Sequence, residues 1–86
     1  MKPYNDVIFN NEFIREFSIN LADTELVWHR DLKTRHITIL SGTGWKFQFE
    51  DELPFELKIG DEFEIYEKTF HRIFKGIDNL VIKIKE

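Results

Sequence analysis

The sequence predicts an all-β fold, either a β-sandwich or a small barrel. Apolar and polar residues alternate with a period of two along most of the 86 residues, which is the period at which a strand places side chains on one face. The alternating runs are short, rich in β-branched and aromatic residues, and separated by turn-forming Gly, Asp, Asn and Pro. Several short strands at close, even spacing are typical of sandwiches and small barrels.

Residues 1–20 are the least regular part of this pattern. Asn10 and Asn11 precede an apolar cluster and could begin a helical turn, whereas Phe13 and Phe17 fall on odd positions, as they would in a strand. We expect a strand, because every neighbouring segment is one. Such a segment can cover a sheet edge, including an edge of a second subunit, that would otherwise be exposed to aggregation.

Five alternating runs follow, and we expect each of them to be a strand. The second run carries Trp45, Phe47 and Phe49 on one face, and we expect these rings in the core rather than around a cofactor. In the last run Lys83 and Lys85 alternate with isoleucines, which indicates a solvated strand face rather than a binding patch. The expected strands span residues 35–40, 45–50, 55–59, 62–65 and 80–85.

Length and composition restrict the class of protein. A chain of 86 residues predicts one domain, residues 1–86. The formal net charge of −4 argues against a nucleic-acid partner, since phosphate contacts require clustered Lys and Arg. There is no cysteine, which excludes disulfides and fits a reducing compartment. No apolar run has the length of a signal peptide core or a membrane span, so we expect a cytoplasmic protein without membrane contact.

Two histidines and an aspartate suggest a binding site. His29 and Asp31 are two residues apart, so they point to the same face if their segment is a strand. If His71 comes from a neighbouring strand, two imidazoles and one carboxylate surround one centre. This donor set is the facial arrangement of non-haem Fe(II) sites, and it also suits Zn²⁺ or Mn²⁺. The alternative is a polar cluster without metal, in which Asp31 pairs with Arg35.

Residues 23–75 resemble the cupin superfamily of small jelly-roll barrels, on the spacing of two motifs. The family's first motif runs Gly, five residues, His-x-His, three or four residues, Glu, six residues, Gly. Its second motif runs Gly, five residues, Pro-x-Gly, two residues, His, three residues, Asn. The matching positions here are Asp23, His29, Asp31, Arg35 and Gly42 for the first motif, and Gly60, Tyr66, Lys68, His71 and Lys75 for the second.

The resemblance implies a small cupin-like jelly-roll barrel with a metal inside it. In the family, two or three His and one Glu hold the metal, so His29, Asp31 and His71 are carried over as candidate ligands. Arg35 stands where the family has its Glu, and a guanidinium cannot coordinate a cation. The implied cofactor is a divalent metal, with Fe(II) favoured and Zn²⁺ or Mn²⁺ as alternatives, or none if Arg35 pairs with Asp31.

Arg35, Gln48 and Tyr66 are candidate substrate-binding residues. Arg35 alternates in step with the apolar Ile37 and Ile39, which indicates that its side chain points inward. There it could bind a carboxylate or phosphate. Gln48 would line the pocket if its strand is turned with that side chain inward. Tyr66, at the expected rim, could donate a hydrogen bond.

These observations leave three functional hypotheses. The first is a metal-dependent cupin acting on a small polar or anionic molecule, with Fe(II)-type oxygenase chemistry as the expected reaction. The second is a metal-free module that binds a sugar or organic acid. The third, implied by the metal-free sugar epimerases of the cupin superfamily, is a metal-free epimerase or isomerase that uses His29 or His71 as its base. Small size and the resemblance also lead us to expect a homodimer.

Overall fold

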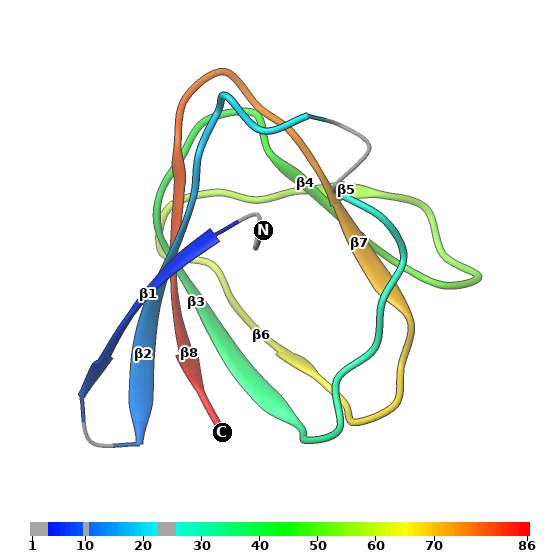
Figure 1. Ribbon diagram of the computed structural model, residues 1–86. Helices are drawn as coiled ribbons and strands as arrows, with labels where there is room; N and C mark the ends of the chain where they lie inside the picture. The colour runs from blue at the N-terminus through cyan, green and yellow to red at the C-terminus, as the bar shows by residue number, and fades with distance from the viewer. Residues whose placement is uncertain (1–3, 10, 23–25) are drawn as a thin grey trace.

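Two antiparallel β-sheets make up the structure, a computed structural model that describes residues 4–9, 11–22 and 26–86 (Figure 1). The described residues contain no helix, and therefore none that could cross a membrane. Across the larger sheet the order is β1 (Tyr4–Phe9), β2 (Glu12–Phe17), β8 (Leu80–Lys85), β3 (Arg35–Ser41) and β6 (Glu62–Ile65). Across the smaller sheet it is β5 (Phe55–Glu56), β4 (Lys46–Phe49) and β7 (His71–Phe74). The predicted all-β fold is confirmed.

The N-terminal segment forms a hairpin rather than the single expected strand. Strands β1 and β2 pair from Tyr4 opposite Phe17 to Phe9 opposite Glu12. Strand β2 in turn pairs with β8 of the same chain, so that β1 ends the larger sheet (Figure 1). The N-terminal segment therefore covers an edge within its own subunit.

The core lies between the two sheets and follows the predicted alternation. Ile37 and Ile39 of β3 are 3% and 1% exposed, whereas Thr38 between them is only half-buried. Burying one such side chain contributes roughly 1.5–3 kcal/mol to stability. Trp45 is fully buried, and its indole Nε1–H donates to the backbone carbonyl of Asp78 at 2.6 Å. A cluster of packed phenylalanine rings continues this core, namely Phe47, Phe49, Phe55 and Phe63.

The crossing segment, residues 26–34, bridges β7 of the smaller sheet at His29 and leads into β3 of the larger one. It does not form the strand that the spacing of His29 and Asp31 suggested, because only one bridge is made, between His29 and His71. Both backbone bonds of that bridge are present, from His29 N to His71 O at 3.0 Å and from His71 N to His29 O at 2.9 Å. One bridge is enough to place the two histidines directly opposite each other.

Candidate metal centre

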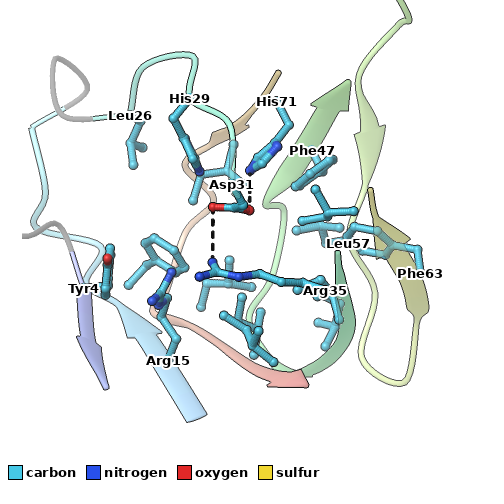
Figure 2. A pocket seen from close by; sticks show the side chains of 18 of the residues that line it. Tyr4, Arg15, Leu26, His29, Asp31, Arg35, Phe47, Leu57, Phe63 and His71 are labelled. Carbon is cyan, nitrogen blue, oxygen red and sulfur yellow. Dashed lines mark ion pairs between the residues drawn. The ribbon is translucent and has the colours of Figure 1, made fainter. Parts of the chain in front are cut away.

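A cavity of about 340 Å³ lies between the two sheets (Figure 2). Its walls are mostly aliphatic and aromatic side chains from both sheets. Six polar or charged residues interrupt them, and these are Tyr4, Arg15, His29, Asp31, Arg35 and His71. An apolar cavity with a few convergent polar groups is the usual form of a small-molecule site.

Three of these residues form a cluster that can hold a metal ion. His29, Asp31 and His71 each offer one ligand atom, and the three atoms lie within 4.8 Å of one another. His29 comes from the crossing segment, Asp31 lies two residues further on, and His71 is the first residue of β7. The sequence-predicted trio is therefore brought together.

Backbone carbonyls orient both imidazole rings in the same way. Nδ1 of His71 lies 2.9 Å from the carbonyl oxygen of Thr69, and Nδ1 of His29 lies 3.3 Å from that of Val27. A carbonyl only accepts hydrogen bonds, so in the neutral rings Nδ1 carries the proton and Nε2 keeps its lone pair. This second contact of a histidine is the one that commonly orients a metal ligand.

The ring of His71 is also fixed by packing. Its side chain is 3% exposed and stacks on Phe47 with a centroid distance of 5.4 Å. It also packs edge-to-face with the ring of His29, with a centroid distance of 4.2 Å. Burial lowers the pKa of His71, and the neighbouring His29 and Arg35 lower it further. The Thr69 carbonyl and Asp31 act in the opposite direction without reversing the shift. The neutral imidazole is therefore favoured.

The carboxylate of Asp31 divides its two oxygens between different neighbours (Figure 2). Oδ1 lies 3.3 Å from Nη1 of Arg35, and Oδ2 lies 3.5 Å from Nε2 of His71. Among the described residues, no donor forms a hydrogen bond with the buried Oδ2. An orphaned carboxylate oxygen is costly unless a cation or proton satisfies it, and this oxygen faces an imidazole lone pair. The donor set therefore fits a divalent metal.

The loop before β7 holds the backbone of Asp31. The amide of Lys68 donates to the carbonyl oxygen of Asp31 at 2.7 Å. Lys68 has a φ of 63°, a conformation that glycine adopts without cost. It occupies the position that the second cupin motif gives to glycine. Asp23, matched to the first position of the first motif, lies outside the described residues.

Arg35 points into the cavity, as its position in the alternation predicted. Its side chain is 18% exposed, and its Nε donates to Oε2 of Glu86 at 2.8 Å. The contact with Asp31 is the longer of its two ion pairs and uses only Oδ1. Arg35 therefore pairs with Asp31 while Oδ2 of Asp31 stays without a hydrogen-bond donor among the described residues, so the ion pair and a bound metal are compatible. From the sequence, the ion pair and the metal were alternatives.

Gln48 and Tyr66 do not line the cavity, and their expected placement is corrected. In β4 the buried Phe47 takes the inner face, which turns Gln48 outward. There the Gln48 amide donates to the carbonyl oxygen of Glu52 at 2.8 Å and accepts from Nε of Arg72 at 2.9 Å. Tyr66 is 64% exposed, on the segment that leaves β6.

Arg15 is a cavity residue that the sequence analysis did not identify. It lies in β2, is 9% exposed, and lines the same cavity as Arg35. The available signal was its odd position between Phe13 and Phe17, which places all three on one face of a strand.

Comparison with solved structures identifies the fold as that of the cupins. A cupin-2 domain containing protein from Shewanella frigidimarina aligns with a TM-score of 0.65 and 17% identity, over 96% of this chain and 78% of that one. A putative mannose-6-phosphate isomerase from Ralstonia eutropha aligns with a TM-score of 0.66 and 13% identity, over 95% of this chain and 81% of that one. A structure of Fe(II) HppE in complex with substrate aligns with a TM-score of 0.69 and 12% identity, over 96% of this chain and 52% of that one.

These likenesses establish the fold and leave the activity to be argued from the site. This chain spans only about half of the HppE structure, 52% of it. No protein-family profile and no curated protein matches the sequence. The predicted cupin-like barrel is thus confirmed at the level of structure.

Proposed function

We propose that this protein is a metal-dependent enzyme with a cupin fold, in which His29, Asp31 and His71 bind one Fe(II) ion. It acts on a small anionic molecule in the cavity by oxygenase chemistry. Zn²⁺ and Mn²⁺ are the alternative metals for the same donors.

The observation that carries this proposal is the unsatisfied Oδ2 of Asp31. It is buried, no described donor bonds to it, and Nε2 of His71 faces it across 3.5 Å. Two electron-pair donors at this distance repel each other unless something positive lies between them. His29 adds a third donor atom within 4.8 Å of the other two. A divalent cation satisfies all three at once.

The choice of Fe(II) rests on the composition of the donor set. Two imidazoles and one carboxylate form the facial triad of non-haem Fe(II) oxygenases, which leaves coordination positions open. When bound there, Fe(II) supplies redox chemistry with O₂ at those positions. A structural neighbour of the same fold is described as Fe(II) HppE with its substrate, which supports this metal.

The side chains around the centre have separate tasks. His71 is locked by Phe47 and by the Thr69 carbonyl, so it provides a rigid ligand from the buried side. His29 is exposed, so the centre can be reached from solvent at that residue. The rest of the cavity is lined mostly by apolar side chains, which offer few partners to bound water. Arg35 holds Oδ1 of Asp31 and presents its guanidinium to an anionic ligand.

A metal-free binding module or isomerase is the second candidate function. The ion pair between Asp31 and Arg35 favours it, because a paired carboxylate is stable without metal. The same fold in a putative mannose-6-phosphate isomerase is compatible with it. It leaves Oδ2 of Asp31 unsatisfied, however, and the metal centre does not.

Metal titration separates the two candidates. The full chain is purified without an affinity tag, stripped with a chelator, and titrated anaerobically with Fe(II), and separately with Mn²⁺ and Zn²⁺, by calorimetry. We expect one metal per chain, retained through gel filtration. If none of the three metals binds stoichiometrically, the metal-dependent function is wrong and the metal-free candidate is favoured.

The homodimer expected from the sequence stays a prediction. Light scattering on the same samples measures the oligomeric state.

A further inference from the structure

Arg15 is one of only two buried polar or charged residues among those that the structure describes, the other being His71. It reaches the cavity from β2, on the hairpin that ends the larger sheet. A guanidinium is seldom left in an apolar wall, because the charge costs free energy unless it is paired. At this position the charge must therefore be paired.

Neighbouring residues hold this guanidinium in a fixed orientation. Nε and Nη2 of Arg15 donate to the two carboxylate oxygens of Asp6 at 2.8 and 3.1 Å. The ring of Tyr4 lies beneath its Cζ at 3.6 Å, and that of Phe13 lies at 5.5 Å. A side chain clamped in this way loses little conformational entropy when it binds a ligand.

Two arginines line the cavity beside the candidate metal centre, and Nη1 of Arg35 contacts Oδ1 of Asp31 in that centre at 3.3 Å. Figure 2 shows the guanidinium groups of Arg15 and Arg35 pointing into the cavity from the side opposite His29 and His71. The remaining walls are apolar. A ligand in this cavity therefore has the arginines and the metal centre as its charged contacts, and hydrocarbon side chains around the rest of its surface.

Charge balance indicates the charge of that ligand. Arg15 and Arg35 are paired with three carboxylates, those of Asp6, Asp31 and Glu86, so these groups together carry one negative charge. A divalent metal held by neutral histidines changes the total to one positive charge. One negative charge on the ligand would then neutralise this set of groups.

We propose that Arg15 and Arg35 form an anion-binding wall that selects a small monocarboxylate with an apolar body as the ligand of the metal-loaded cavity. This inference rests on the proposed metal centre, because the positive charge comes from the metal. It also disfavours a sugar, because a polyhydroxylated ligand would place most of its hydroxyl groups against hydrocarbon walls.

Hexanoate binding to the Zn²⁺-loaded protein tests the proposal, with hexanamide and glucose as neutral probes. We expect calorimetry to show hexanoate binding and no comparable binding of hexanamide or glucose. Arg15→Met should weaken hexanoate binding by about tenfold to a hundredfold, the effect of one charge-assisted hydrogen bond, while zinc stoichiometry stays unchanged.

Asp6→Asn is the matched control, because it breaks the same ion pair and keeps the guanidinium. We expect it to retain hexanoate binding. An equal loss in Asp6→Asn and Arg15→Met would show that the pair is only structural and would overturn the proposal. If Arg15→Met fails to fold, Arg15→Lys, which keeps a charge without the planar fork, should still weaken hexanoate binding; unchanged binding there would also overturn it.

The outcomes separate this inference from the proposed function. Zinc binding without hexanoate binding, or with binding indifferent to Arg15→Met, overturns the anion-binding wall and leaves the metal centre intact. Absence of zinc binding in the unaltered protein overturns the proposed function, and it also overturns the anion-binding wall, which depends on the metal.

Discussion

Oδ2 of Asp31 and Nε2 of His71 face each other at 3.5 Å inside the cavity, and no described donor bonds to the carboxylate oxygen. Asp31 reaches this position from the crossing segment, and His71 from the start of β7. The backbone bridge between His29 and His71 joins these two parts of the chain. The candidate centre is therefore built where the two sheets are tied together.

His71→Ala should abolish stoichiometric metal binding. The substitution removes the most buried ligand, and a site with two remaining donors holds a divalent metal much more weakly. The matched control is His36→Ala, because His36 lies on β3 outside the cavity lining and contacts Glu62 at 2.8 Å. Metal analysis after gel filtration is the measurement. Equal loss in both variants, or equal retention, would show that His71 is not a ligand.

Arg35→Met tests how the arginine relates to the metal. If the arginine stands beside a metal, removing its positive charge should strengthen metal binding by about tenfold, because the cation–cation repulsion is lost. If the arginine instead takes the place of a metal, the unaltered protein binds none and Arg35→Met gains a site. Parallel titrations of the two proteins distinguish these results, and weaker binding in Arg35→Met would contradict both.

The metal-free protein should lose stability as the pH falls below about 6.5. The pKa of His71 is lowered in the folded state, whereas the unfolded chain has the ordinary value of 6.5. Below that pH the unfolded chain binds a proton that the folded chain resists, so stability is fully present above 6.5 and declines on acidification. Urea unfolding across this range measures the slope. The slope should be smaller in His71→Gln, and an identical slope in both proteins would contradict the account.

Lys68→Gly should stabilise the protein by about 0.5–1 kcal/mol, because a side chain costs free energy at positive φ and glycine does not. The φ of Lys68 is 63°. Glu67→Gly, in the same turn but without positive φ, is the control, and it should destabilise through added freedom of the unfolded chain. Thermal and urea unfolding report both effects. A loss of stability in Lys68→Gly would show that the turn is not strained.

Alternation along the chain predicted the all-β class, and the spacing of the two motifs predicted the cupin-like barrel. Strands β3, β6 and β8 lie where the period of two placed them, because each buries one face against the other sheet. His29 and Asp31 came together through the same rule, although their segment makes only one bridge. Residues two apart therefore point to the same side here even though the segment does not pair continuously with a neighbouring strand.

The misplaced and missed residues depended on tertiary arrangement. Gln48 and Phe47 lie on opposite faces of β4, and only the packing of that strand against the larger sheet decides which of them faces inward. Arg15 was missed because the N-terminal segment was expected to be a single strand. Its burial follows from the hairpin with β1, which supplies Asp6 and Tyr4 to the guanidinium.

The central claim is that a metal ion satisfies Oδ2 of Asp31. A crystal structure of the Fe(II)-loaded protein, with anomalous data at the iron edge, tests it most directly. We predict a single anomalous peak between Nε2 of His29, Oδ2 of Asp31 and Nε2 of His71. A structure without a peak there, in which the Asp31 carboxylate has closed fully onto Arg35, would contradict the account.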